Sequence, residues 1–238
     1  MLWACGIGFW LLVEYDGMKT HMLTVGILAF GSLISDPGPE IPLLICKHLE
    51  VPTPFSVEFG RYSGKTRGGA PTLVPVTKGG APVNATIFVL KSGVTECEAV
   101  DMLWRREIRT KNKNRTYQAR RTRNAVRVKA LRGFAGLDVV LYTDFYASGK
   151  IRQPKPTNLA RSAIESARTA ADGNDGISYL IDVRSTGVET PLSEAYAEEI
   201  MKQTKTASLE EALAKTRGNQ ARAKGANSQE QPAWIRPR

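Results

Sequence analysis

Histidine and cysteine are scarce in this chain of 238 residues, and their scarcity excludes several kinds of chemistry. The two histidines, His21 and His48, make a histidine-based catalytic triad or a multi-histidine metal site a poor explanation of function. The three cysteines, Cys5, Cys46 and Cys97, are widely spaced and form no CxxC pair. They indicate neither a disulfide framework nor a zinc site, and they favour a reducing, cytoplasmic location. Any chemistry must therefore depend on carboxylates, hydroxyls and backbone groups.

Long hydrophobic runs and nucleotide-binding motifs are also missing. The apolar run Trp3–Val13 is too short to span a bilayer and lacks a basic segment before it, so we expect a soluble protein with no membrane contact. We interpret residues 1–22 as an N-terminal extension, with a misassigned start codon as one explanation of it. No GxGxxG motif is present, and Gly60 and Gly64 have three intervening residues where a P-loop needs four. We predict no cofactor and no metal.

The composition that remains is that of a globular domain, with 42% hydrophobic and 24% charged residues. Apolar or alternating runs predict strands at residues 23–30, 55–61, 72–76, 86–90, 126–130 and 137–146. Capping and periodicity predict helices at residues 96–109, 158–171 and 191–202, and a short one after Ser208. This order, strands first and then helices, predicts an α+β fold with a mixed or antiparallel sheet. The domain should cover residues 23–204, and residues 205–238 should form a short helix and a disordered basic tail.

Two local expectations can be tested directly. In the strand at residues 55–61, alternation should turn Phe55, Val57 and Phe59 inward and leave Glu58 on the other, solvated face. The strands at 72–76 and 86–90 flank a turn at Gly79–Pro82, and this close spacing predicts a hairpin or meander.

The net charge of +10 comes from one segment. Residues 105–132 hold twelve basic residues and a single acid, Glu107; removing these from the totals of 33 and 23 leaves 21 basic and 22 acidic residues elsewhere. The common explanation of such a run is a solvated loop and strand face. The alternative is that Arg105–Arg132 contacts nucleic acid or another polyanion.

Glu107 lies on the apolar face of the helix predicted to begin at Glu96. Thr95 and Glu98 form a capping box before it, and helical periodicity places Glu107 beside Leu103 and Trp104. Burial beside an indole should raise the pKa of this carboxyl toward neutrality, as general acid–base catalysis requires. The alternative is a structural Glu at the helix end, paired with Arg109 or another base. Arg105 and Arg106 are expected to point away.

A second signal is the Gly31-Ser32 pair, which follows the predicted strand that ends at Phe30. A strand that ends in Gly-Ser exposes consecutive backbone N–H groups, and these can bind an anion such as a carboxylate. By itself the pair is a weak signal, because Gly-Ser after a strand usually forms an ordinary turn.

Together these motifs resemble the γ-glutamylcyclotransferase family, and in particular its ChaC-type, glutathione-acting branch. Residues 28–38 (LAFGSLISDPG) are similar to the family's amino-terminal Tyr-Gly-Ser-Leu-Ile signature, with Phe30 in place of the tyrosine. Residues 103–107 (LWRRE) resemble the helix that carries the family's catalytic glutamate. Further similar segments are Arg61–Ser63, Arg67–Gly69, Thr72–Pro75, Gly176–Leu180 and Gly187–Pro191.

The resemblance implies a small mixed barrel with surrounding helices and a cofactor-independent reaction. Residues Phe30, Gly31, Ser32, Leu33 and Arg61 would bind the γ-glutamyl substrate. Glu107 would move the proton while the substrate's α-amine attacks its own γ-carbonyl, which releases 5-oxoproline and an amine. Two other hypotheses stay open: a binding module that uses the basic segment, and a catalytically inactive relative that senses a small amino-acid metabolite.

Overall fold

The computed structural model describes residues 23–64, 67–120, 122, 124–171 and 173–218. The predictions for the N-terminal extension at residues 1–22 and for the tail at residues 219–238 lie outside these ranges. None of the helices in the described part of the chain has both the length and the apolar character needed to cross a membrane.

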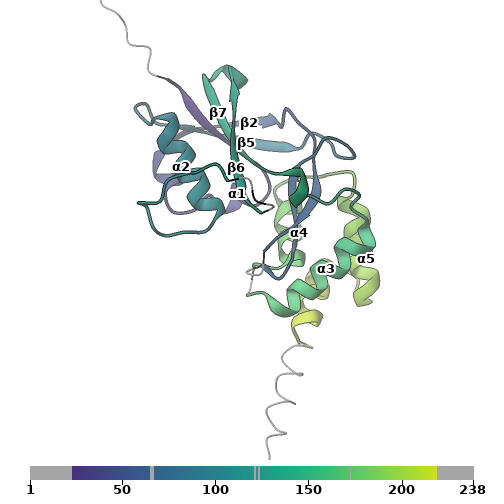
Figure 1. The fold of residues 1–238 in the computed structure, drawn as a ribbon. Coiled ribbons are helices and arrows are strands. Elements are labelled where there is room, and N and C mark those ends of the chain that lie inside the picture. The colour runs from purple at the N-terminus through teal and green to yellow at the C-terminus, as the bar shows by residue number, and fades with distance from the viewer. Residues whose placement is uncertain (1–22, 65–66, 121, 123, 172, 219–238) are drawn as a thin grey trace, which may run out of the picture.

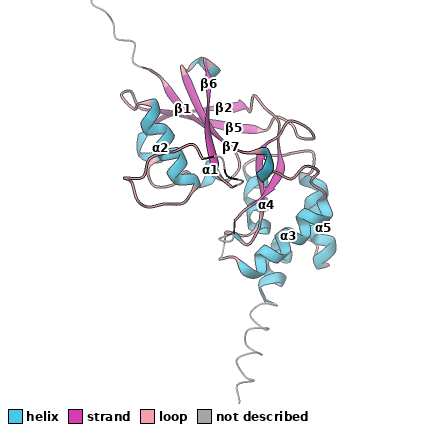
Figure 2. Ribbon diagram, viewed as in Figure 1, coloured by secondary structure: helices cyan, strands magenta, loops and turns pink. Residues whose placement is uncertain are grey.

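A five-stranded sheet forms one half of the fold (Figures 1 and 2). Its order is β2-β5-β1-β7-β6, and β1 pairs antiparallel with β5 and parallel with β7. The sheet is therefore mixed, as predicted. Within the described residues it ends at β2 and β6 and does not close, so the predicted barrel is not confirmed. The strands are β1 (Val25–Ala29), β2 (Ile45–Pro52), β5 (Asn84–Leu90), β6 (Val126–Arg132) and β7 (Val139–Phe145).

A separate two-stranded sheet consists of β3 (Val57–Tyr62) and β4 (Pro71–Pro75), which pair antiparallel. The predicted hairpin between 72–76 and 86–90 is therefore wrong, because β4 pairs with β3 and β5 pairs with β1 and β2. The intervening chain turns back along β3, where Ala81 forms a bridge with Val57. A Cβ atom on Gly80 would lie 2.6 Å from the carbonyl oxygen of Val57, so this close approach requires glycine.

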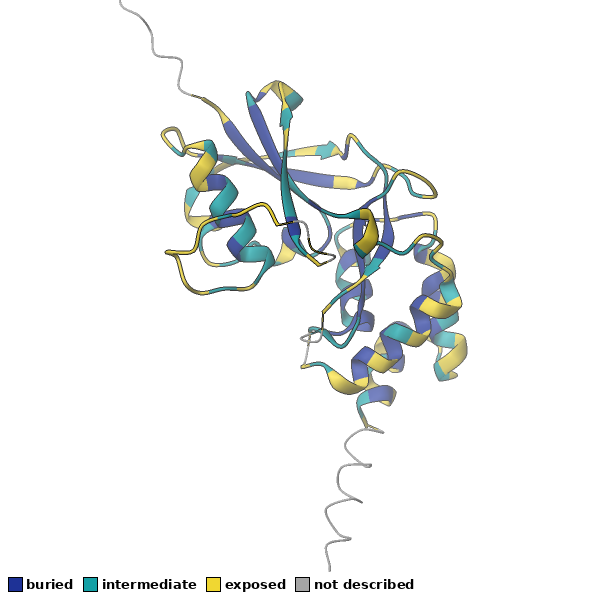
Figure 3. Cartoon of the chain, viewed as in Figure 1, coloured by how far each residue is buried: buried dark blue, intermediate teal, exposed yellow. Residues whose placement is uncertain are grey.

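The helices divide between the two halves of the fold. Helix α2 (Glu96–Glu107) packs against the five-stranded sheet, whereas α3 (Pro156–Thr169), α4 (Gly176–Ser185) and α5 (Ser193–Thr204) surround β3 and β4. Figure 3 shows that α3 turns its buried residues toward this second core and its exposed residues outward. We call β1, β2, β5, β6, β7 and α2, with the single turn α1 (Ser32–Ser35), the sheet half, and the remainder the helical half. Short 3-10 turns in the described residues include η1 (Ile41–Leu44), η3 (Phe134–Gly136) and η4 (Ala147–Gly149).

The predicted capping box at the start of α2 is confirmed. Thr95 Oγ1 accepts from the Glu98 N–H at 3.3 Å, and Glu98 Oε2 accepts from the Thr95 N–H at 2.8 Å. The short helix after Ser208 is also confirmed: residues 209–218 are helical, and Ser208 Oγ accepts from the Glu211 N–H at 3.1 Å.

Two helix starts differ from the prediction. Asn158 does not cap α3, because Lys155 is the N-cap and Pro156, whose ring fixes φ and which has no N–H to satisfy, occupies the first helical position. Helix α5 begins at Ser193, two residues after the predicted Pro191. Strand β2 and helix α4 were not predicted at all.

The outward orientation predicted for Glu58 is wrong. The residues Val57–Gly60 are all buried. Val57 and Phe59 belong to the helical core, and Glu58 is covered by the segment that leads into α5. Only 1% of Glu58 is exposed. Its Oε1 accepts from the Thr190 hydroxyl at 2.5 Å and from the Phe59 N–H at 2.8 Å, and its Oε2 accepts from the Leu192 N–H at 3.2 Å. The carboxylate thereby ties β3 to the start of α5.

Candidate active site

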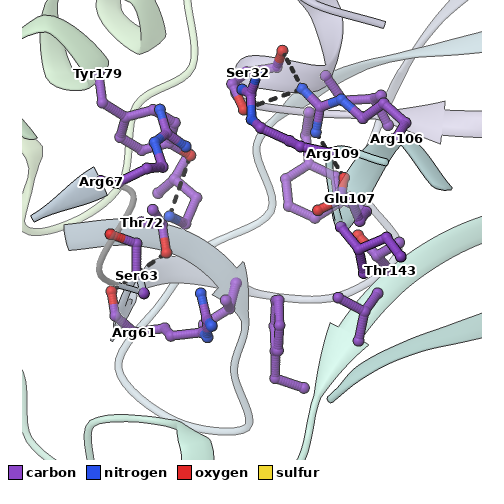
Figure 4. A pocket seen from close by; sticks show the side chains of 18 of the residues that line it. Ser32, Arg61, Ser63, Arg67, Thr72, Arg106, Glu107, Arg109, Thr143 and Tyr179 are labelled. Carbon is purple, nitrogen blue, oxygen red and sulfur yellow. Dashed lines mark hydrogen bonds and ion pairs between the residues drawn. The ribbon is translucent and has the colours of Figure 1, made fainter. Parts of the chain in front are cut away.

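A cavity of about 430 Å³ lies between the sheet half and the helical half. Four of the five predicted substrate-binding residues and the predicted catalytic residue line it: Phe30, Ser32, Leu33, Arg61 and Glu107. Figure 4 shows Arg61, Ser63 and Thr72 on one side of the cavity and Ser32, Arg106 and Glu107 across from them. The other lining side chains with polar atoms are Arg67, Arg109, Asn124, Thr143 and Tyr179.

The Phe30–Leu33 turn follows directly after β1. Gly31 has φ 59° and ψ −139°, a backbone conformation that side-chain-bearing residues rarely adopt. A Cβ atom at this position would lie 2.8 Å from the Tyr179 hydroxyl, so space as well as φ requires glycine. Ser32 and Leu33 are the first residues of α1, where N–H groups have no acceptor within the helical turn. The turn thus presents backbone donors beside the cavity, although the Leu33 side chain is buried in the sheet core.

Glu107 is the last residue of α2, one turn beyond the fully buried Leu103. Its side chain is 17% exposed, and its Oε1 accepts from Arg106 Nη1 at 2.7 Å. The expectation that Arg106 points away is therefore wrong. Glu107 is paired with a base, as the structural alternative predicted, and that base is Arg106. The predicted partner Arg109 binds Asp36 instead, at 2.9 Å. The second oxygen of Glu107, Oε2, has no hydrogen-bond partner among the described residues.

Arg106 connects Glu107 to the glycine-serine turn. Its Nη2 donates to the Ser32 carbonyl at 2.8 Å and lies 3.3 Å from Ser32 Oγ, while its Nε donates to the Asp36 carbonyl at 2.8 Å. The guanidinium is only 10% exposed and holds segments that are 74 residues apart in sequence. Sequence reasoning missed this role, because helical periodicity gives the direction of a side chain but not the carbonyl groups that a distant loop brings to it.

Arg105 also turns inward. It is 7% exposed, and its Nε and Nη2 donate to the two carboxylate oxygens of Glu40 at 2.9 and 2.8 Å. The prediction that Arg105 points away from the core is therefore also wrong. The paired geometry explains why a second arginine can be buried beside α2.

Tyr179 and Arg67 form the helical half's wall of the cavity. The Tyr179 hydroxyl accepts from the Leu73 N–H at 3.2 Å, and the Arg67 guanidinium lies 5.0 Å from the Tyr179 ring centroid. Burial raises the pKa of Tyr179, an effect that the Leu73 hydrogen bond and Arg67 oppose. The segments that contain these residues were noted in the sequence only for their family resemblance, and neither residue was assigned a role.

The basic segment 105–132 is partly neutralised in the fold. In the part of this segment that the structure describes, five basic residues form ion pairs: Arg105 with Glu40, Arg106 with Glu107, Arg109 with Asp36, Lys129 with Asp144 and Arg132 with Glu96. Arg115 and Arg127 lie over the rings of Trp104 and Tyr146. The polyanion contact stays a prediction that these pairs neither support nor contradict.

No family model matches the chain, and no curated protein matches it either. Among solved structures, it is similar to a γ-glutamylcyclotransferase specific to glutathione from yeast. The similarity covers 76% of this chain and 99% of the yeast chain, with a TM-score of 0.45 and 11% sequence identity. That protein belongs to the family that the two motifs resemble. At this TM-score and identity the likeness carries no weight for the activity, which depends on the site itself.

Proposed function

We propose that the cavity catalyses γ-glutamylcyclotransfer, the intramolecular conversion of a γ-glutamyl compound into 5-oxoproline and a free amine. The supporting observation is that two segments with separate sequence signals line one cavity and are joined there by Arg106. These segments are the Phe30–Leu33 turn and the end of α2 at Glu107.

In this proposal the backbone groups at Gly31, Ser32 and Leu33 bind the α-amino-acid end of the substrate. The free N–H groups at the start of a helical turn suit an α-carboxylate, because they donate hydrogen bonds and carry partial positive charge. The Phe30 side chain contributes apolar surface, and its ring packs edge-on against Phe55 with 5.9 Å between centroids.

Glu107 serves as the general base and then as the general acid. Its unpartnered Oε2 takes a proton from the substrate's α-ammonium, and the freed amine attacks the γ-carbonyl carbon. A bond forms between the α-nitrogen and the γ-carbon. The bond from the γ-carbon to the leaving nitrogen then breaks as Glu107 returns the proton to that nitrogen. The second proton that the α-nitrogen loses goes to the departing amine, which leaves as an ammonium ion. Most of the acceleration would come from holding the chain of the substrate in a folded, reactive geometry.

The test is release of 5-oxoproline from γ-glutamyl compounds by the wild-type protein and by Glu107→Gln. We expect the variant to lose about 10²–10⁴-fold in kcat, because it keeps the shape of the side chain but cannot move the proton. Glu96→Gln is the matched control, since Glu96 lies in the first turn of the same helix and outside the cavity. A fully active Glu107→Gln variant with an unchanged melting temperature would disprove the proposal.

A further inference from the structure

Arg61 lines the cavity and forms no ion pair with a described residue, since Glu107, the carboxylate that attracts it from a distance, is paired with Arg106. The guanidinium carbon of Arg61 lies 4.0 Å from the centroid of the Phe145 ring, and this stacking holds the side chain in place. The guanidinium donates no hydrogen bond to any described residue, and its Nε is buried without a partner. Nearby, the Ser63 hydroxyl also lines the cavity and is likewise buried and unpartnered. Buried polar groups are nearly always hydrogen-bonded, so these two require an explanation.

Arg67 is the second cavity arginine without a carboxylate partner in the described part of the chain. Its Nε donates to the Asn174 carbonyl at 3.3 Å, and its guanidinium lies over Tyr179. Burial lowers the pKa of both Arg61 and Arg67, and the nearby Glu107 carboxylate opposes this only in part. By contrast, the other two cavity arginines, Arg106 and Arg109, are paired with Glu107 and Asp36.

The cavity thus holds two positive charges that the described residues leave unpaired. The α-amino-acid end of a γ-glutamyl compound cannot compensate them, because its ammonium and its carboxylate cancel. In addition, that end already has its partners in the proposed reaction: the backbone donors of the Phe30–Leu33 turn for its carboxylate, and Glu107 for its ammonium. The compensating negative charge must therefore lie on the other part of the substrate, which leaves as the amine.

We propose that the site selects γ-glutamyl compounds whose leaving amine carries two negative charges, bound by Arg61 and Arg67 with Ser63 as an additional donor. This inference rests on the proposed cyclotransferase reaction and specifies its substrate. Guanidinium groups bind carboxylates through paired, charge-assisted hydrogen bonds, so each unpaired arginine can take one carboxylate. The amine side of the substrate would point toward β3 and β4, away from Ser32.

Three substrates that differ in the charge of the leaving amine test the proposal, and the first two have leaving amines of nearly equal size. They are γ-glutamyl-glutamate, γ-glutamyl-glutamine and γ-glutamyl-methylamide, whose leaving portions carry two, one and no carboxylates. We expect kcat/KM for 5-oxoproline release to fall in that order, by on the order of tenfold for each lost charge pair. In Arg61→Gln and Arg67→Gln the ratio of kcat/KM for γ-glutamyl-glutamate to kcat/KM for the methylamide should shrink.

Two further variants separate charge from packing. Arg61→Lys should keep part of the preference because it keeps the charge, and its melting temperature reports whether loss of the ring contact alone destabilises the fold. Arg152→Gln removes one positive charge from an exposed position outside the cavity and should leave the preference unchanged.

Failure of the subsite and failure of the reaction give different results. Equal kcat/KM for the three substrates would overturn the subsite and leave the reaction standing. If none of them releases 5-oxoproline, the proposed reaction is wrong. The subsite is then tested by measuring the equilibrium binding of the same compounds. Tighter binding of γ-glutamyl-glutamate than of γ-glutamyl-methylamide, lost in Arg61→Gln, would support the subsite, and equal binding would overturn it.

Discussion

At the scale of single residues, the geometry of the site depends on one guanidinium. Arg106 Nη1 holds Glu107, while Nη2 and Nε hold the carbonyl groups of Ser32 and Asp36. These acceptors lie in different directions, and the planar fork of an arginine meets them at once. A lysine ammonium is a single point of charge and cannot reproduce that arrangement.

Arg106→Lys is therefore expected to lower kcat by on the order of 10–100-fold, because Glu107 and the turn would no longer keep their relative position. KM should change less, since the backbone donors of the turn remain. A parallel measurement of the melting temperature separates this positioning role from general loss of structure. If kcat is unchanged in a folded Arg106→Lys protein, the positioning role is wrong.

At the scale of elements, the sequence predicted what local patterns determine and missed what tertiary contacts determine. The capping box of Thr95 and Glu98 is complete within four residues, so α2 was found with its correct start. Strand β2 was missed because Cys46, Lys47 and His48 are all exposed and show no alternation. Helix α4 is the exception, because its N-cap is local: the Asp175 carboxylate accepts from the Ile177 and Ser178 N–H groups. That signal was overlooked, and with it the role of Tyr179.

The buried Glu58 also belongs to this scale, because it links β3 to α5. Burial raises the pKa of Glu58, and hydrogen bonds from Thr190, Phe59 and Leu192 oppose that rise only in part. The folded chain thus binds a proton at Glu58 more readily than the unfolded chain does. Its contribution to stability is complete below the unfolded pKa and is lost as the pH rises through the folded pKa.

Glu58→Gln removes this titration. We expect the free energy of unfolding of the wild type, measured relative to Glu58→Gln by urea denaturation, to decrease as the pH rises above about 4. The exposed Glu165→Gln serves as a control and should show no such trend. A wild-type advantage that grows with pH would contradict the interpretation.

At the scale of the whole molecule, Asp144 helps to join the two sheets. Its Oδ1 accepts from Lys150 Nζ at 2.5 Å, and the same ammonium donates to the Pro75 carbonyl of β4 at 2.6 Å. Burial alone would raise the pKa of Asp144. Hydrogen bonds from Lys129 and Lys150 outweigh this effect and hold the pKa below its usual value. The stability that Asp144 contributes is therefore present above the unfolded pKa and is lost as the pH falls through the folded pKa.

Asp144→Asn is expected to destabilise the protein at neutral pH by about 1–3 kcal/mol, because Lys150 would keep its charge without a carboxylate partner. The difference between wild type and variant in the free energy of unfolding should shrink as the pH is lowered toward about 3. Chemical denaturation at several pH values checks this, and a difference that does not depend on pH would show that the ion pairs contribute nothing.

The placement of the cavity between the two halves also has a consequence for how its specificity can change. Glu107, Ser32 and Arg106 come from the sheet half, whereas Arg61, Arg67 and Tyr179 come from the helical half. The groups proposed to make and break bonds and the groups proposed to recognise the leaving amine are thus carried by different elements. Substitutions in β3, β4 and their connecting loop could redirect such an enzyme to new amines while its proton-transfer machinery stays intact, which makes this wall the natural place to diversify when altered selectivity is wanted.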